Sequence, residues 1–330
     1  MTDSPRRTCL ARLPDGTLRV LQGAELEQID ALRATQDQVV WLDILSPDED
    51  DFALLTREFD LHELALEDLR KRRQRPKVDT YPDQHVIVAY EVLPNARKLS
   101  FELGELHLFS GAGYLVSVHW TDSPAIRELA ERFTLRPAMV APSVGALLYH
   151  LLDAVVDGYF PLLDRLSDRI DQLEDRVIEG GNTSVALREL LVIKRSLLEL
   201  RRILSPQRDV ANALLRRDLP LVDDAGLPYY QDLYDHLVRV LDAVDLYRDL
   251  VATTLDANLA VTSNNLNAVM KGLTALTVVL MLPTLIAGIY GMNFRFMPEL
   301  AQSWGYPFAL VLMAGVMVGS ILFFRWRRWF

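Results

Sequence analysis

The stretch that decides the fold is Gly272–Asn293, with the sequence GLTALTVVLMLPTLIAGIYGMN. It contains no charged residue, and about twenty such residues are enough for one helix to cross the hydrocarbon of a bilayer. A second uncharged run covers Tyr306–Phe324, after a short connection. Two adjacent runs of this length predict a pair of membrane-spanning helices, because core helices of soluble domains are rarely so long and apolar.

The basic residues that flank the two runs predict their orientation. Lys271 precedes the first span, and Arg325, Arg327 and Arg328 follow the second, whereas the connection holds only Arg295. Basic residues stay on the cytoplasmic side of a membrane. We therefore expect a multi-pass protein of the cell (inner) membrane, with both termini in the cytoplasm.

Composition and motifs exclude several classes of function. The formal net charge of −10 argues against nucleic acid as a partner. The single cysteine, Cys9, excludes an internal disulfide. Gly111-Ala112-Gly113 lacks the third glycine of a dinucleotide site, and the chain has neither a P-loop nor an H-E-x-x-H pair. The six histidines are interpreted as ordinary structural residues, and the protein is not expected to be an enzyme.

Residues 1–142 are predicted to form a mixed α/β domain. Apolar and β-branched runs predict strands over Thr8–Leu13, Thr17–Leu21, Val39–Ile44, His85–Leu93, Glu102–Phe109 and Tyr114–His119. Pro14-Asp15-Gly16 is typical of a hairpin turn between the first two. Ser46-Pro47 and Ser123-Pro124 each predict a helix start with a serine cap, and a further helix is expected over His62–Arg72.

Residues 143–221 are predicted to form antiparallel helices. Ser143–Glu179 is apolar at helical spacing and contains Pro161, where we expect a bend. Gly180-Gly181-Asn182 then ends this helix, and Thr183 or Ser184 caps a return helix that reaches Arg216.

Residues 222–271 predict a stalk helix, because no proline or glycine interrupts Tyr229–Lys271. Apolar residues follow a heptad pattern at Leu233, Leu237, Val240, Val244, Tyr247 and Val251. Nothing ends this helix before the first span, so one helix of roughly 90 Å is expected over Tyr229–Tyr290 at 1.5 Å per residue. A lone helix of that length cannot bury its seam, which predicts a parallel homo-oligomer.

Small or polar residues also recur on one face of the first span. They are Thr274, Thr277, Met281, Thr284, Gly288 and Gly291. Such a stripe is used either for close helix packing or for the wall of a pore between subunits. The second span has only a G-x-x-x-G face at Gly315 and Gly319, so it is expected to be the outer, lipid-facing helix. Because neither span carries a charge, a pore here suits a hydrated ion, with the Asn293 amide at its outer mouth.

Several motifs resemble the CorA family of magnesium channels. The most specific run is Tyr290-Gly291-Met292-Asn293-Phe294, followed by Met297-Pro298-Glu299-Leu300 and Trp304-Gly305-Tyr306-Pro307. Cytoplasmic segments also resemble the family: Leu66-Glu67-Asp68-Leu69, Gln74-Arg75-Pro76-Lys77-Val78, Leu152-Asp153-Ala154-Val155-Val156-Asp157, Pro206-Gln207-Arg208-Asp209-Val210 and Asp232-Leu233-Tyr234-Asp235-His236. The resemblance covers most of the chain.

The resemblance implies an α+β membrane protein that assembles as a funnel-shaped homopentamer. Its parts would be an α/β cytoplasmic domain (1–142), antiparallel helices (143–221), a stalk helix (222–271) continuous with a pore-lining span (272–291), an extracytoplasmic loop (292–305), a second span (306–325) and a basic tail (326–330). The implied selectivity filter is Gly291, Met292 and Asn293. The implied pore lining is Asn267, Met270, Leu273, Thr277, Met281, Thr284 and Gly288, with Leu273 and Met281 as the constriction.

The resemblance also implies regulation by a cation bound between subunits. The matching carboxylates are Asp68 and Asp232, with Glu67 and Asp153 as further candidates. Taken alone, each of these four is more often an ordinary surface charge. Arg295 departs from the acidic loop that is common in the family and makes the formal charge of this loop about zero, so cation attraction to the mouth should be weaker.

The function implied is a magnesium channel, also for cobalt and nickel ions, that admits Mg²⁺ down the membrane potential and is gated by cytoplasmic Mg²⁺. Its expected partners are copies of itself, lipid and divalent cations. A transporter of zinc or another divalent cation from the same superfamily is an alternative, disfavoured because the spans lack Cys and His. A membrane-tethered sensor without transport is the alternative from another class.

The assembly gives the first testable prediction. The seam of the stalk helix requires partners, and the resemblance implies five chains. Mass measurement of the detergent-purified protein should therefore give a homopentamer. A stable monomer would contradict both the predicted pore and the predicted role of the seam.

Overall fold

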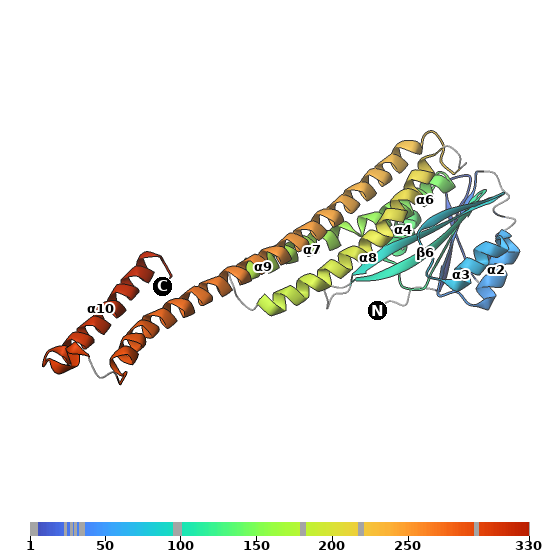
Figure 1. The fold of residues 1–330 in the computed structure, drawn as a ribbon. Helices are drawn as coiled ribbons and strands as arrows, with labels where there is room; N and C mark the ends of the chain where they lie inside the picture. Colours follow the sequence, from blue (N-terminus) through green and yellow to red (C-terminus); the bar gives the residue numbers. More distant parts are fainter. Residues whose placement is uncertain are drawn as a thin grey trace. The chain divides into compact units, whose positions relative to one another are not determined.

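The computed structural model describes residues 6–22, 25–26, 29, 32, 37–94, 101–178, 183–216, 221–293 and 297–329. The chain divides into two compact units, Met1–Thr253 (unit 1) and Thr254–Phe330 (unit 2). Helix α9 (Leu227–Tyr290) contributes residues to both units, and Figure 1 shows the ribbon coloured along the chain.

Unit 1 is built on a seven-stranded sheet with the strand order β2-β1-β3-β7-β6-β5-β4. The strands are β1 (Arg7–Arg12), β2 (Leu18–Leu21), β3 (Val39–Leu45), β4 (Lys77–Tyr81), β5 (Gln84–Pro94), β6 (Phe101–Gly111) and β7 (Tyr114–His119). Neighbours are antiparallel except β3 and β7, which are parallel. All six predicted strands and the first hairpin are confirmed. β4 was not predicted, because its charged and polar side chains hide the strand pattern.

The central strands β3 and β7 are buried along nearly their whole length, as expected for strands covered on both faces. Asp43 is the polar exception on β3. Its carboxylate accepts a hydrogen bond from Ser117 Oγ at 2.5 Å and lies 3.2 Å from Nε2 of His119. Ser117 in turn accepts a hydrogen bond from the indole of Trp41 at 3.0 Å. These bonds satisfy the buried polar groups inside an otherwise apolar sheet.

Helices cover both faces of this sheet (Figure 1). On one face lie α2 (Glu49–Phe59) and α3 (Glu63–Lys71), and on the other lie α4 (Pro124–Leu135), α5 (Pro137–Val140) and α6 (Val144–Asp157). The prediction of Ser46 as a helix cap is wrong. Asp48 is the cap, because its side chain accepts the amide of Asp51 while Asp51 bonds back to the Asp48 amide.

The long helix predicted from residue 143 is two helices, α6 and α7 (Phe160–Ile178), so the expected bend at Pro161 is wrong. α6 ends at Gly158, and Pro161 lies in the first turn of α7, where its missing N–H costs no hydrogen bond. The return helix is confirmed as α8 (Thr183–Leu215), whereas the predicted break at Gly180-Gly181-Asn182 lies outside the described residues.

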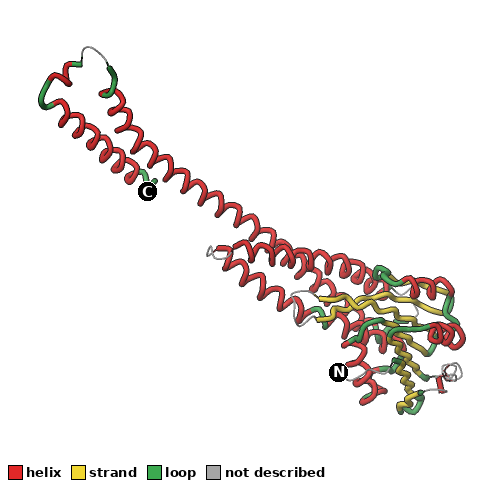
Figure 2. The backbone as a smooth tube through the Cα atoms, turned by 90° about the horizontal axis from the view of Figure 1, so that it is seen from below, coloured by secondary structure: helices red, strands yellow, loops and turns green. Residues whose placement is uncertain are grey.

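The continuous stalk helix is confirmed, but the argument that its seam needs copies of itself is wrong. Leu233, Leu237, Val240, Val244 and Val251 are all buried within the protomer. In unit 1, α9 contacts α6 through Tyr149 and Tyr230, α7 through Phe160 and His236, and α8 through an ion pair of Arg201 and Asp245. Figure 2 shows these helices side by side. The seam alone therefore gives no information on assembly.

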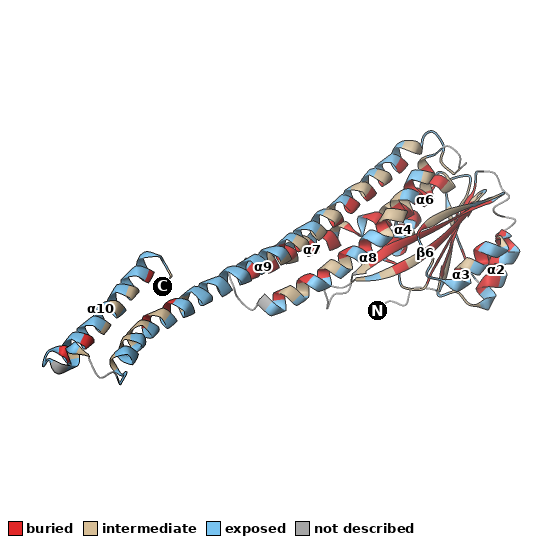
Figure 3. Ribbon diagram, in the orientation of Figure 1, coloured by how far each residue is buried: buried red, intermediate tan, exposed pale blue. Residues whose placement is uncertain are grey.

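Three helical segments of the described chain are long and apolar enough to cross a membrane: Val144–Ile178, Leu227–Tyr290 and Gly305–Trp326. Half of the apolar window in the first is buried inside the protein, compared with 11% in each of the other two. Val144–Ile178 is α6 and α7, whose apolar side chains pack in the core of unit 1. The two predicted spans are the ones whose apolar side chains remain exposed (Figure 3).

Unit 2 contains the C-terminal part of α9, a short 3-10 helix η2 (Pro298–Ala301) and α10 (Gly305–Trp326). α9 packs on α10 through Ala275 and Val279, which form a buried cluster with Phe324. Gly305 has a steric role at the start of α10, because a Cβ there would lie 2.0 Å from the carbonyl oxygen of Glu299. Only glycine, which has no Cβ, therefore fits at position 305.

A buried carboxyl on β5 predicts a pH dependence of stability. Glu91 is 3% exposed, and burial raises its pKa from 4.5 to about 7, although hydrogen bonds from Ser123 and the backbone of Ala125 partly oppose this. The folded state thus holds the proton more tightly than the unfolded chain. Stability from this group is present below pH 4.5 and is lost as pH rises through about 7, by about 3 kcal/mol in total.

We therefore expect Glu91→Gln to gain stability relative to the parent as pH rises from 5 to 8. The measurement is the thermal unfolding midpoint of the detergent-purified protein at each pH. Glu131→Gln, at an exposed carboxyl on α4, is the matched control and should follow the parent. A difference between Glu91→Gln and the parent that does not change with pH would contradict the prediction.

Candidate ion path and cation cluster

An uncharged groove lies on the membrane-spanning part of α9. It has a volume of about 760 Å³ and is lined by Thr277, Leu280, Met281, Thr284, Leu285, Gly288, Ile289 and Met292. Five of the residues proposed for the pore and filter line it together. Asn267, Met270 and Leu273 lie earlier on α9 and are exposed, but they do not line this groove.

The groove lies on the side of α9 that faces away from α10. A helix turns about 100° per residue, so Thr277, Met281, Thr284 and Gly288 lie roughly 180° around the axis from Ala275 and Val279. Ala275 and Val279 are buried against α10, whereas Met281 is 62% exposed. The α9 helix therefore has one side that packs within the protomer and an opposite side open to another molecule.

The threonine hydroxyls in the groove have defined hydrogen bonds. Thr277 Oγ1 donates to the carbonyl oxygen of Leu273 at 2.9 Å, and Thr284 Oγ1 donates to that of Leu280 at 2.8 Å. Each hydroxyl proton is thus used inside the helix. The lone pairs of these oxygens remain available, so the groove presents acceptors, which suit a cation or its water shell.

The helix ends directly before the sequence Gly291-Met292-Asn293. The Gly291 amide still donates to the Ala287 carbonyl at 2.9 Å, and all three residues are exposed. A Cβ on Gly291 would lie 3.2 Å from that same carbonyl oxygen, so a side chain here would crowd the helix end. Arg295, for which a weaker attraction of cations was predicted, lies outside the described residues.

A second candidate site lies in unit 1, where Asp153 of α6 approaches Asp232 and His236 of α9. Their ligand atoms lie within 4.8 Å of one another, and among the described residues this is the one group of three or more potential metal ligands. Asp232 and Asp153 are candidate ligands from the sequence, whereas the sequence pattern indicated a structural role for His236. The i, i+4 spacing of Asp232 and His236, which places both on one helix face, was the available signal.

The imidazole of His236 is poorly satisfied between the two carboxylates. Its Nδ1 lies 3.8 Å from Asp153 and its Nε2 lies 3.6 Å from Asp232, both beyond hydrogen-bond distance. Nδ1 is buried without a hydrogen-bond partner among the described residues. An orphaned ring nitrogen beside two carboxylates fits a divalent cation, because such an ion would take oxygen and imidazole ligands together.

The carboxylates of this cluster are electrostatically strained without a cation. Burial, followed by repulsion from Asp157 and Asp232, raises the pKa of Asp153, although His236 lowers it. The pKa of Tyr149 is also raised, to about 12, by burial and by the charges of Asp153 and Asp232. A bound cation would relieve this repulsion.

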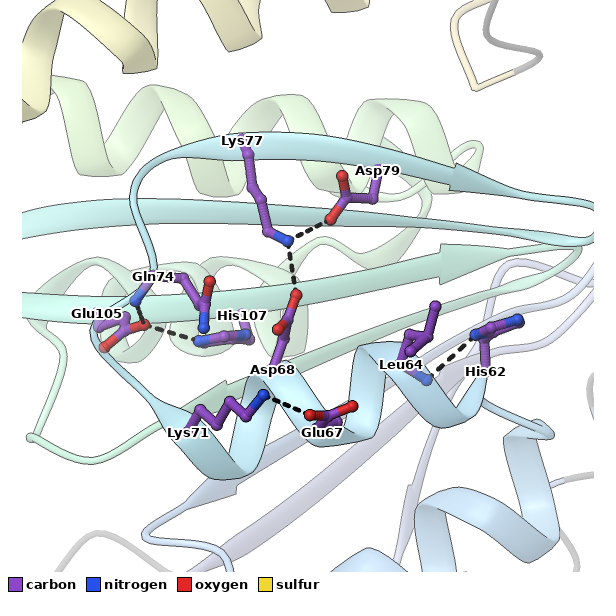
Figure 4. Close-up of polar contacts among 10 residues, drawn as sticks. All are labelled: His62, Leu64, Glu67, Asp68, Lys71, Gln74, Lys77, Asp79, Glu105 and His107. Atoms are coloured by element: carbon purple, nitrogen blue, oxygen red, sulfur yellow. Dashed lines mark hydrogen bonds and ion pairs between the residues drawn. The ribbon is translucent and has the colours of Figure 1, made fainter.

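Asp68 and Glu67 lie elsewhere, on α3, and each has a lysine partner in the protomer (Figure 4). Asp68 accepts from Lys77 Nζ at 2.6 Å, and the same ammonium contacts Asp79 at 2.5 Å. Although partial burial lowers the pKa of Lys77, the bonds to Asp68 and Asp79 raise it overall. Glu67 pairs with Lys71. The protomer thus brings Asp153 and Asp232 together but does not bring Asp68 or Glu67 to them.

These features define a class of protein. Two exposed apolar helices, an uncharged groove with two threonine hydroxyls among apolar side chains, and a separate carboxylate–imidazole cluster fit a membrane transporter for divalent cations.

The chain belongs to the family described as CorA-like Mg²⁺ transporter protein, whose profile matches residues 36–328. It is 34% identical over 292 residues to the cobalt/magnesium transport protein CorA of Thermotoga maritima, covering 88% of this chain and 83% of that protein. It is 32% identical over 307 residues to YfjQ of Bacillus subtilis, covering 92% and 95%. The complete structure of the CorA magnesium transporter from Methanocaldococcus jannaschii has the same fold, with a TM-score of 0.80 at 23% identity, over 96% of this chain and 97% of that one.

The protein is therefore a divalent cation transporter of this superfamily, in a family of transporters and not of enzymes. The resemblance inferred from the Gly291-Met292-Asn293 motif is confirmed, as are the N-terminal α/β domain, the long helix and the apolar C-terminal helices.

The cluster of Asp153, Asp232 and His236 is predicted to bind a divalent metal ion. Asp232→Asn and His236→Gln should each weaken Co²⁺ binding at one site per chain by about tenfold or more, because each removes a ligand. Calorimetric titration of the full-length protein measures this. Asp235→Asn, which removes a neighbouring carboxylate on α9, is the control and should bind as the parent does. Equal Co²⁺ affinity in all four proteins would show that the cluster is not a metal site.

Proposed function

We propose that this protein is a channel for hydrated Mg²⁺, with Co²⁺ and Ni²⁺ as further permeant ions, driven by the membrane potential and closed by cytoplasmic Mg²⁺. The observation that carries the proposal is the uncharged groove on α9, which lies opposite the α10 contact, includes Thr277 and Thr284, and extends to Met292, the residue before Asn293. The names of relatives that transport cobalt and magnesium support Mg²⁺ and Co²⁺.

The groove suits a cation that keeps its water. Mg²⁺ dehydrates reluctantly, and stripping its shell would require several charged oxygen ligands. The groove offers neutral oxygens from Thr277 and Thr284, followed by the Asn293 amide at its end. Zn²⁺ is disfavoured as the permeant ion, because neither Cys nor His lies in either span.

The proposed pore requires several chains, because one groove is open on its outer side. The exposed stripe of α9 continues toward the cytoplasmic end through Leu259, Leu266, Met270 and Leu273, all more than half exposed. Apolar side chains at this spacing favour packing against copies of the same helix. We propose five copies, as the resemblance implies, with Leu273 and Met281 forming the hydrophobic constriction.

The proposed gate depends on which carboxylates can exchange their partners for a cation. Asp153, Asp232 and His236 are poorly paired within the protomer, whereas Asp68 is neutralised by Lys77. We place Asp68 of one subunit against Asp232 of its neighbour, with Glu67 and Asp153 close by. Without a cation Asp153 and Asp232 repel each other, and a cation that binds them and displaces Lys77 from Asp68 favours the closed arrangement of subunits. Asp232 and the constriction share helix α9, which links cation binding to the pore.

Loss of the filter amide tests the pore. Asn293→Ala should lower Mg²⁺ uptake by about tenfold or more while the protein still assembles, because every subunit loses its side-chain ligand at the mouth. Uptake into cells that depend on this protein for Mg²⁺ measures the effect. Asn264→Ala removes an amide from the opposite side of α9 and should retain uptake. Normal uptake by Asn293→Ala would show that this amide is not the filter.

Loss of the sensor carboxylates tests the gate. In inside-out patches, Asp68→Asn with Asp232→Asn should raise the bath Mg²⁺ needed for half-closure by about tenfold or more, without abolishing the current. Lys77→Gln should act in the opposite direction, because it frees Asp68 for the cation. Asp249→Asn, an exposed carboxylate on α9, is the control. Closure of the double variant at the same Mg²⁺ concentration as the parent would rule out these two carboxylates as the sensor.

A further inference from the structure

A cavity of about 330 Å³ lies in unit 1 where α4, α5 and α6 meet. It is lined by Arg132, Leu135, Arg136, Met139, Val140 and His150. Arg132 belongs to α4, Arg136 is the residue between α4 and α5, and His150 lies on α6. Three nitrogen-bearing side chains thus converge on one cavity from three elements, and no carboxylate lines it.

Neither guanidinium group has a close carboxylate partner among the described residues, although the charge of Arg132 acts on Asp153 and opposes the rise in its pKa. Arg132 lies 4.0 Å from Glu128, at the limit of an ion pair, and Arg136 makes no ion pair with any residue that the structure describes. Arg127, one and a half turns earlier on α4, instead bonds Asp122 at 2.8 Å. Positive charge is therefore left at the cavity, while the neighbouring arginine on the same helix is neutralised.

His150 adds a buried group that lacks a partner. Its Nδ1 is inaccessible to solvent and forms no hydrogen bond with the described residues. Burial, and then the charge of Arg132, lower the pKa of this imidazole. A buried polar atom without a partner is uncommon in folded proteins and often marks a site completed by a ligand or an ion.

The rim of the cavity is apolar and open. Leu135 is 80% exposed and Met139 is 69% exposed, although both are large apolar side chains. The volume is at the lower end of the range for small-molecule sites. A ligand with a charged group toward the arginines and a flat apolar body on Leu135 and Met139 would match this arrangement.

We propose that this cavity binds a phosphate-bearing anion. Guanidinium groups offer forked N–H donors that match phosphate oxygens, so Arg132 and Arg136 would hold the phosphate, with the His150 ring in the cavity wall beside them. Leu135 and Met139 would cover an apolar part, such as the base of a nucleotide. None of these residues belongs to the proposed pore or cation cluster, so the site does not depend on the proposed channel function.

The test uses the full-length protein in nanodiscs of phosphatidylcholine, in buffer free of divalent metals, titrated with ADP, pyrophosphate or adenosine. ADP and pyrophosphate should each bind one saturable site per chain, and adenosine should bind much more weakly. Arg132→Gln and Arg136→Gln should each raise the Kd by about tenfold or more. Arg127→Gln is the matched control, with the same change of charge on the same helix, and should bind as the parent does.

Three results would overturn the proposal: no saturable binding of either phosphate compound, the same Kd in Arg132→Gln and Arg136→Gln as in the parent, or adenosine binding as tightly as ADP. A second arm uses nanodiscs that contain phosphatidylglycerol. If phosphatidylglycerol weakens ADP binding to the parent but not to Arg132→Gln, the lipid headgroup competes for the site, and the site is assigned to a lipid headgroup. If ADP binding is unchanged, the site is assigned to a soluble phosphate compound. Either result of this arm supports an anion site.

Discussion

The hydrocarbon of the membrane imposes the constraint on which the rest of the structure depends. A span there must satisfy its own backbone and still offer polar atoms to an ion. α9 meets both demands because one of its sides packs against α10 and the opposite side carries the threonines. Ala275 and Val279 pack against α10, while Thr277 and Thr284 on the other side donate their protons to carbonyls one turn earlier. The hydroxyl oxygens of these two threonines are then uncharged acceptors, set among apolar side chains such as Met281.

In unit 1, the carboxylates differ in how completely the protomer pairs them. Lys77 lies within hydrogen-bond distance of Asp68, so this carboxylate is neutral in effect without any metal. Asp153 and Asp232 both lie near the His236 ring, at distances too long for hydrogen bonds. A cation would therefore bind more favourably at Asp153 and Asp232, because at Asp68 it would have to displace the ammonium of Lys77. In the proposed gate, this difference would determine which residues respond to the cation concentration.

The parts predictable from sequence are those with local causes. The length of the two uncharged runs identified both spans, and runs of apolar and β-branched residues identified six strands of the sheet. Predictions failed where distant partners decide the outcome. The heptad pattern at Leu233 and Val240 indicated copies of the same helix, but α6, α7 and α8 of the same chain cover those residues. β4 was missed because Lys77 and Asp79 are stabilised by Asp68 of α3, a contact that no local pattern encodes. His236 was undervalued because only the fold brings it to Asp153.

Ion flux through the purified protein alone tests the central claim most directly. The protein would be reconstituted into liposomes that contain a Mg²⁺-sensitive dye, and a potential, negative inside, would be imposed with a potassium gradient and valinomycin. A divalent ion gains about 4.6 kcal/mol per 100 mV, so a channel should fill the liposomes with Mg²⁺ and fill them faster as the potential is increased. Liposomes that admit no Mg²⁺ at any potential, although the protein in them is folded and assembled, would contradict a conducting pore and leave the spans as a membrane tether.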